Sequence, residues 1–318
     1  MERRAQVKRK FIVNPHSGKA HTAGGLAGLE RFFTARTGGF DCAVAGSRDA
    51  AVRITRESLR EGIDQVVAVG GDGTVNAVVN GFFEDGRPIR PESCLAVANV
   101  GTGSDYFKSV AAGATVGDWR ELVLSHVVRA VDIGRAGYGD SGCRDQYFVN
   151  MASTGMIAEV VGRKHRGVGW LPARLRYLMP TVSSLFTYRP KRVQVEVDGQ
   201  CSALEVLAIS VCKGGYAGGG MRFGGGVTLF DGLFDVTFFH AMKPLEMLVK
   251  LRKLYTGAFQ GEPAIQKSQA RRVSIRSPSA MPVEFDGELC GTTDVELSVE
   301  PGLLHVCFPK SPTAFPGS

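Results

Sequence analysis

The sequence predicts an α/β domain with a mainly parallel sheet, followed by a larger β-rich domain. As far as about residue 130, short apolar runs alternate with helix-like segments, and beyond it strand-like runs follow one another. Several later runs alternate apolar and polar residues, as in 193–197 (VQVEV). The first pattern is typical of βαβ units. The second is typical of an antiparallel sandwich or barrel.

In the first domain, each expected strand ends in a polar or glycine-containing turn. Ligands of parallel α/β sheets bind at the carboxyl ends of the strands. We therefore expect the turns at 14–18, 70–74 and 101–105 to converge on one crevice. The expected strands are 10–13, 40–45, 66–69 and 95–98, and the expected helices are 22–36, 49–61 and 75–83.

The second domain is expected to begin near residue 130. We predict domains at 1–130 and 131–318, with the alternative that the last residues pack back on the first domain. The active site is expected in the cleft between the two domains. The expected strands are 130–135, 146–151, 192–197, 203–212, 234–240, 271–276, 283–286, 295–299 and 304–308.

Composition narrows the class of protein. The 318 residues carry a formal net charge of +7, which favours anionic partners such as nucleotides or an anionic membrane surface. Seven scattered cysteines form no C-x-x-C pair, which is typical of reduced thiols in the cytoplasm. No apolar run is long enough to span a membrane, and the charged start has no signal-peptide core. We expect a cytoplasmic protein with at most peripheral contact with lipid.

The most informative motif is Gly-Gly-Asp-Gly-Thr at 70–74, between a strand and a helix. Glycines let backbone N–H groups approach an anion, and a helix offers its positive N-terminal end to phosphate. A carboxylate at Asp72 would repel phosphate unless a divalent cation lies between them. The motif therefore predicts a site for a nucleotide with its metal ion.

Other turns carry weaker signals, and each is also explained as an ordinary turn or helix cap. The turn at 14–19 (NPHSGK) offers polar side chains and Lys19 to phosphate but lacks Walker spacing. Thr102 is a candidate phosphate donor. Asp231 lies in an Asp-Gly turn. Near the end, Asp286 and Glu288 flank a glycine, so one can accept a proton while the other orients it.

These motifs in this order resemble the catalytic domain of the diacylglycerol kinase family, which includes sphingosine and ceramide kinases and soluble bacterial lipid kinases. The resemblance rests on 14–18, 70–76, 101–105 and 131–134, and then on 148–150, the triple glycine at 218–220, 231–236 and 286–288. It covers roughly residues 8–309. It implies ATP-dependent phosphorylation of a lipid hydroxyl, as in phospholipid biosynthesis, with ATP bound by the domain at 1–130 and lipid by the domain at 131–318.

The resemblance also implies a role for each site residue. Asp72 acts with the catalytic Mg²⁺, and Glu288 takes the proton with Asp286 as its partner, although the sequence leaves open which of the two takes it. Asp231, with the backbone carbonyls around Thr228 and Leu233, matches a second, structural Mg²⁺ site. The residues expected to contact ATP are Asn14, Pro15, His16, Ser17, Gly18, Lys19, Gly70, Gly71, Asp72, Gly73, Thr74, Asn76 and Thr102. Ser104 stands where the family usually has Asn, so a role for this position does not carry over.

Basic and aromatic residues interleave at 163–179 and 185–192, which suits an interfacial helix against an anionic membrane. An ordinary surface helix is the equal alternative. No nucleic-acid partner is expected, and a homodimer is left open.

Two other functions compete with the lipid kinase. A NAD kinase-like enzyme also uses a Gly-Gly-Asp-Gly-Thr turn, but the Asn-Pro-x-Ser-Gly turn and the terminal Asp-Gly-Glu favour a lipid kinase. A non-catalytic lipid-binding homologue is disfavoured by Asp72, Asp231 and Glu288. A dehydrogenase is weaker, because no G-x-G-x-x-G follows the first strand.

Overall fold

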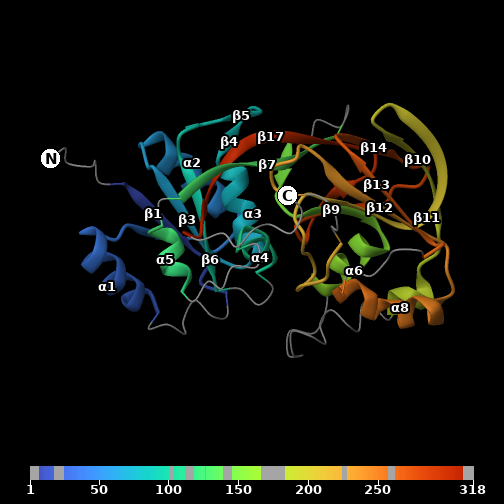
Figure 1. Ribbon diagram of the computed structural model, residues 1–318, viewed down its shortest axis with the longest axis horizontal. Helices are drawn as coiled ribbons and strands as arrows, with labels where there is room; N and C mark the ends of the chain where they lie inside the picture. The colour runs from blue at the N-terminus through green and yellow to red at the C-terminus, as the bar shows by residue number, and fades with distance from the viewer. Residues whose placement is uncertain are drawn as a thin grey trace. The chain divides into compact units, whose positions relative to one another are not determined.

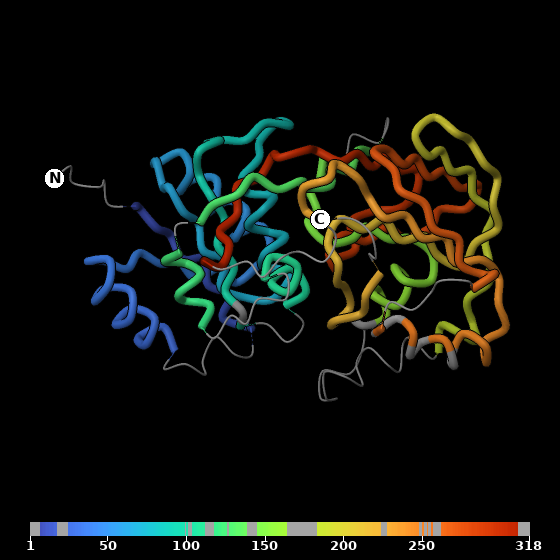
Figure 2. Tube along the Cα trace, viewed as in Figure 1, coloured from blue at the N-terminus to red at the C-terminus, as the bar shows by residue number. Residues whose placement is uncertain are grey.

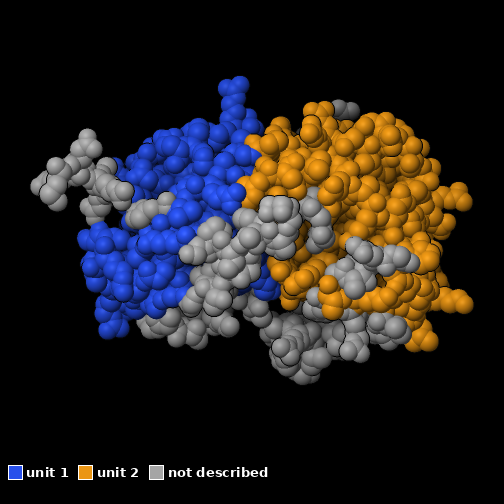
Figure 3. Space-filling view, in the orientation of Figure 1, with its two compact units in different colours: residues 1–131, 302–318 blue, residues 132–301 orange. Residues whose placement is uncertain are grey.

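The structure is a computed structural model that describes residues 7–17, 25–100, 104–111, 118–125, 127–138, 145–165, 183–223, 228–256 and 262–310. The chain divides into two compact units (Figure 3). Unit 1 contains residues 1–131 and 302–318, and unit 2 contains residues 132–301.

Unit 1 is built on a parallel sheet whose strand order is β17–β6–β3–β1–β2. The central strand β3 has no exposed residue, because apolar runs in such sheets are covered on both faces. The end of the chain supplies the edge strand, which Figure 2 shows in red among the blue and green segments of this unit. The strands are β1 (Arg9–Val13), β2 (Cys42–Val44), β3 (Gln65–Gly70), β6 (Cys94–Asn99) and the last part of β17 (Val295–Phe308).

Helices cover this sheet in two groups (Figure 1). α1 and α5 pack together through Phe33 and Trp119, whereas α2 and α3 pack on each other. α2 begins at a Ser47 cap, whose side chain accepts a hydrogen bond from Ala50 N at 3.2 Å. The helices are α1 (Gly25–Thr37), α2 (Arg48–Arg60), α3 (Asp72–Gly81), α4 (Asp105–Ala111) and α5 (Trp119–Val123); β4 (Phe83–Glu84) and β5 (Arg87–Pro88) form a hairpin.

Unit 2 is an antiparallel β structure with the strand order β16–β15–β9–β11–β10–β14–β17. The long strand β11 pairs with β10 through its first half and with β9 and β12 through its second half. Its apolar core includes Phe148, Phe234 and Phe285, whose rings stack. The remaining elements are β7 (Val127–Gly137), β8 (Gln146–Phe148), β9 (Met151–Gly155), α6 (Met156–His165), β10 (Lys191–Val197), β11 (Gln200–Cys212), β12 (Phe234–His240), α8 (Pro244–Thr256), β13 (Ile265–Ala270), β14 (Arg272–Arg276), β15 (Pro282–Phe285) and β16 (Glu288–Thr292).

The predicted fold class is confirmed, with corrections to single elements. The helix expected at 75–83 begins earlier, at Asp72, and ends at Gly81, before the β4–β5 hairpin. The strand expected at 146–151 is two strands, β8 and β9. The two strands expected at 295–299 and 304–308 are one strand, β17. Three elements, α8, β13 and β16, were not predicted from the sequence. None of the helices within the described residues combines the length and hydropathy that a membrane span requires.

Candidate active site

The turn after β1 and the first turn of α3 are joined by the side chain of Asn14. Its Nδ2 donates to Thr74 Oγ1 at 3.0 Å, while its Oδ1 accepts from His16 N at 2.9 Å. The backbone N–H of Asn14 donates to Val69 O at 2.9 Å. Asn14 therefore closes its own turn and fixes that turn against the β3–α3 junction. The structure thus brings together two of the predicted ATP-binding segments.

The two glycines at this junction have different surroundings. A Cβ atom on Gly70 would lie 2.2 Å from Thr74 Oγ1, so the close approach of the Thr74 side chain requires glycine there. Around Gly71, a Cβ atom would meet nothing within 4 Å. Gly71 is the N-cap of α3 and provides no side-chain cap, so its side of the helix N-terminus is open to a ligand.

Asp72 lies in the first turn of α3, where a carboxylate interacts favourably with the helix dipole. Its side chain is partly exposed, and its Oδ1 accepts a hydrogen bond from Tyr106 N, in the first turn of α4, at 3.1 Å. The carboxylate therefore links the N-terminal ends of two helices. Ser104, just before α4, is in the left-handed region with a φ of 49°.

Asn76 forms hydrogen bonds with residues of α2 and α3. It is fully buried, and its Oδ1 accepts from Arg48 Nη2 at 2.9 Å and from Asn80 Nδ2 at 3.2 Å. Arg48 was not identified from the sequence, where its position just after the Ser47 cap was its only signal. Of the other predicted ATP contacts, Gly18, Lys19 and Thr102 lie outside the described residues.

In unit 2, the Asp286-Gly287-Glu288 turn joins β15 to β16. Asp286 has a φ of 50°, and its carboxylate is nearly buried. Oδ2 accepts from Val149 N at 2.9 Å, and Oδ1 accepts from Asn150 N at 2.8 Å and Met151 N at 3.0 Å. These bonds to the link between β8 and β9 fix the orientation of the turn.

A second carboxyl group lies beneath the same turn and was not identified from the sequence. Glu284 is fully buried; its Oε1 accepts from Ser153 Oγ at 2.5 Å and its Oε2 from Gly287 N at 2.7 Å. Burial raises the pKa of Glu284 to about 8, helped by the charges of Asp286 and Glu288 and opposed by the two hydrogen bonds. Three carboxyl groups thus surround one turn, and the one underneath holds its proton at neutral pH.

The predicted structural-metal residues surround a lysine. Lys213, which directly follows the last residue of β11, is 1% exposed. Its Nζ lies 2.8 Å from Asp231 Oδ1 and 3.0 Å from Asp132 Oδ2, and donates to Leu233 O at 2.9 Å. Burial raises the pKa of Asp231, but hydrogen bonds from Lys213, Thr228 N and Leu233 N outweigh that effect and hold the pKa below its usual value.

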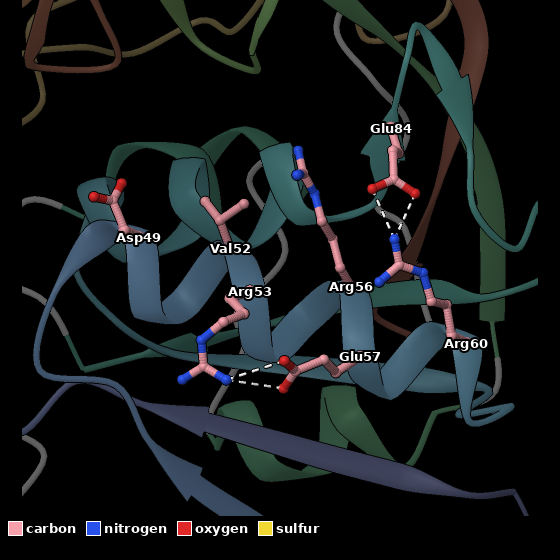
Figure 4. Close-up of a pocket in the computed structure, with 7 residues that line it drawn as sticks. All are labelled: Asp49, Val52, Arg53, Arg56, Glu57, Arg60 and Glu84. Carbon is pink, nitrogen blue, oxygen red and sulfur yellow. Dashed lines mark hydrogen bonds and ion pairs between the residues drawn. The ribbon is translucent and has the colours of Figure 1, made fainter.

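A surface depression on α2 is separate from these residues. Figure 4 shows two of its three arginines paired with glutamates, Arg53 with Glu57 at 3.0 Å and Arg60 with Glu84 at 2.6 Å. Because these charges neutralise one another and no predicted site residue lines the depression, we assign it no function.

The geometry of each unit now defines a class of protein: a parallel α/β unit with a glycine-rich strand-to-helix junction, and a β-rich unit with a carboxylate turn. Comparison with known families agrees. Residues 8–136 match the diacylglycerol kinase catalytic domain, and residues 150–308 match the YegS C-terminal NAD kinase beta sandwich-like domain. The chain belongs to the diacylglycerol kinase catalytic-domain family, in the form that carries the YegS C-terminal domain. This confirms the resemblance seen in the sequence, and it favours a lipid kinase over a NAD kinase.

Individual relatives cover almost the whole chain. A diacylglycerol kinase of Bacillus subtilis is 27% identical over 95% of this chain and 96% of its own length. A diacylglycerol kinase of Staphylococcus carnosus is 26% identical over 92% and 90%, respectively. The crystal structure of a diacylglycerol kinase from Bacillus anthracis is 19% identical, with a TM-score of 0.68 over 95% of this chain and 97% of the other, and shows the same fold.

Proposed function

We propose that this protein is an ATP-dependent kinase that phosphorylates the hydroxyl group of a lipid such as diacylglycerol. The observation that supports this most is the β3–α3 junction. There the backbone at Gly71 is open, Thr74 is held by Asn14, and a helix N-terminus is available to phosphate. Membership of a lipid kinase family supports a lipid acceptor.

Phosphoryl transfer needs positioning and charge neutralisation more than covalent chemistry. In this proposal, the turns of unit 1 hold the phosphates of ATP. The partly exposed Asp72 would hold a magnesium ion bound with ATP, because such an ion needs only one or two carboxylates from the protein, and the ion would neutralise charge on the phosphates.

Unit 2 supplies the base and the lipid site in this proposal. Asp286 accepts three backbone N–H bonds, which suits it to orienting the turn. Glu288 follows at the start of β16 and is partly exposed. We therefore propose that Glu288 accepts the proton of the lipid hydroxyl and that Asp286 positions the turn. The location of the active site between the two units stays a prediction.

An assay with radiolabelled ATP tests the reaction. The acceptors are diacylglycerol, phosphatidylglycerol and a sphingoid base, each in detergent, with NAD as the control acceptor. We expect label in one lipid and none in NAD, and loss of the labelled lipid in Asp72→Ala. Label in NAD, or none in any lipid from a folded protein that binds lipid, would replace the proposal with the NAD kinase or the non-catalytic function.

A further inference from the structure

The 228–233 turn of unit 2 carries the residues that match the family's second magnesium site, and this chain has a buried lysine there. The expected ligands are the carboxylate of Asp231 and the carbonyls of Thr228 and Leu233. Two of these three groups accept hydrogen bonds from Lys213 Nζ, at 2.8 Å for Asp231 Oδ1 and 2.9 Å for Leu233 O.

The ammonium group is fully satisfied by its surroundings. Lys213 has three N–H donors, and Asp231 Oδ1, Asp132 Oδ2 and Leu233 O lie within 3.0 Å of its Nζ. The Lys213 side chain has no exposed surface and Asp132 is 5% exposed, whereas the Asp231 side chain is 26% exposed, so the ammonium group itself has no access to water. A buried charge is tolerated when it is paired and hydrogen-bonded in this way.

The two carboxylates are satisfied as well. Asp231 Oδ2 accepts from Thr228 N at 2.5 Å, and Asp231 Oδ1 accepts from Leu233 N at 3.1 Å. Asp132 Oδ2 accepts from Gly232 N at 2.7 Å. Backbone donors therefore share with Lys213 the negative charge that would otherwise attract a cation.

A magnesium ion does not fit beside this ammonium. Mg²⁺ binds oxygen at about 2.1 Å, so an ion on the same oxygens would lie no more than about 5 Å from Nζ, even on their far side. Two positive charges at that distance repel each other, and the burial of Lys213 and Asp132 limits the screening by water on the lysine side of the site. Among the residues that the structure describes, no group of three acidic, His or Cys side chains provides an alternative site.

We propose that the Lys213 ammonium takes the place of the structural divalent cation and acts as an internal cation that ties β7, β11 and the 228–233 turn together. Unit 2 then folds without a bound metal ion. Any magnesium requirement of the protein arises from the nucleotide alone. This inference concerns the metal dependence of the fold and does not depend on which reaction the protein catalyses.

Thermal unfolding without nucleotide tests the proposal on the wild-type protein first. We expect the same Tm in EDTA and in millimolar MgCl₂, and no magnesium retained after gel filtration, measured by elemental analysis. The same titration of Asp72→Ala removes any contribution of weak ion binding at the nucleotide site. A Tm that rises by several degrees with Mg²⁺ in both proteins, or about one magnesium retained per chain, would overturn the proposal.

Two substitutions at Lys213 then separate the charge from the packing. Lys213→Asn leaves two carboxylates facing each other with space between them. We expect its Tm to fall by about 10 °C and Mg²⁺ to restore much of the loss. Lys213→Met fills the space without charge, so Mg²⁺ should not restore the Tm that this variant loses. Lys253→Asn removes an exposed lysine paired with Glu262 and serves as the control, with little change in Tm.

If Lys213→Asn does not fold, the wild-type measurement still decides. A Lys213→Asn variant as stable as the wild type would refute the role of the ammonium as an internal cation. The Lys213→Asn variant could also fold with a lowered Tm that neither Mg²⁺ nor Mn²⁺ raises. That result would show that the pocket cannot hold a divalent ion, and would overturn the proposal that the Lys213 ammonium takes the place of one.

Discussion

Gly70 and Gly71 are neighbours in the sequence, yet a side chain would meet different surroundings at each position. We expect Gly70→Ala to destabilise the protein by about 1–3 kcal/mol, because the new Cβ atom collides with Thr74 and disturbs its bond to Asn14. Gly71→Ala should fold nearly normally, because its Cβ atom meets open space, while the KM for ATP rises about tenfold. Denaturant unfolding and ATP kinetics of the pair check this. Equal loss of stability in both variants would contradict it.

Asp72 is the residue on which the proposed chemistry depends most. We expect Asp72→Ala to abolish phosphorylation while its circular dichroism stays unchanged, because the Asp72 side chain is partly exposed and lies outside the apolar core. Activity assays beside a thermal melt measure both properties. Turnover close to that of the wild type would remove Asp72 from the mechanism.

At the scale of elements, the β15–β16 turn separates a positioning residue from the expected base. Asp286→Asn replaces one carboxylate oxygen by an NH2 group, which cannot accept from a backbone N–H, so we expect a loss of about 2 kcal/mol of stability. Glu288→Gln should keep its stability and lose about 100-fold or more in kcat, with little change in ATP binding. Single-turnover kinetics with ATP titration check the second expectation. An unchanged transfer rate in Glu288→Gln would return the base role to Asp286 or Asp72.

The carboxyl group under this turn makes stability depend on pH. The pKa of Glu284 is about 8 in the folded protein, because of its burial, and about 4.3 in an unfolded chain. Between these values, the folded state holds a proton that the unfolded state has lost. Within this window, each unit by which the pH rises therefore lowers the free energy of unfolding by about 1.4 kcal/mol. Below about pH 4.3 and above about pH 8, Glu284 adds no further pH dependence.

Glu284→Gln keeps an acceptor for Gly287 N and has no charge, so it should remove this dependence. We expect the variant to match the wild type near pH 4.5 and to be clearly more stable near pH 8, as measured by urea unfolding at each pH. If the free energy of unfolding changed with pH in the same way in both proteins, Glu284 would not be the source of the pH dependence.

At the scale of the whole molecule, the charge of +7 bears on contact with a membrane. We expect reversal of Arg163, Lys164 and Arg166 to Glu to weaken binding to vesicles that contain phosphatidylglycerol, because juxtamembrane basic residues each contribute about 1 kcal/mol near an anionic surface. In the described part of this segment, Arg163 pairs with Glu159 at 3.2 Å. Residue 166 and the aromatic run after it lie outside the described residues.

The matched control reverses Arg271, Arg272 and Arg276, on and next to β14. Both triple variants lower the formal net charge from +7 to +1. If both bind vesicles equally, net charge accounts for binding and the interfacial segment is not needed. Light scattering of the same samples tests the open prediction of a homodimer.

Much of this molecule followed from local pattern. Alternating strands and helices predicted the parallel sheet, because its strands must be apolar on both faces and joined by helices. Period-two alternation predicted the β-rich unit. The glycine-rich junction followed in the same way, since Gly-Gly-Asp-Gly-Thr directly follows the apolar run of β3. Element boundaries were less exact, as at α3, whose first residues, Asp72-Gly73-Thr74, have no apolar periodicity.

Other features depended on residues far apart in the chain. Glu284 and Ser153 are 131 positions apart, and their bond is visible only once β15 pairs with β9. Lys213 meets Asp231 and Asp132 only because β11, β7 and the 228–233 turn meet in the folded unit. The sequence by itself determined the fold class, the family and the candidate residues, since these rest on short-range pattern and motif order. Only the tertiary structure decided which carboxylates are buried and what cation they face, because burial and charge pairing depend on packing between distant segments.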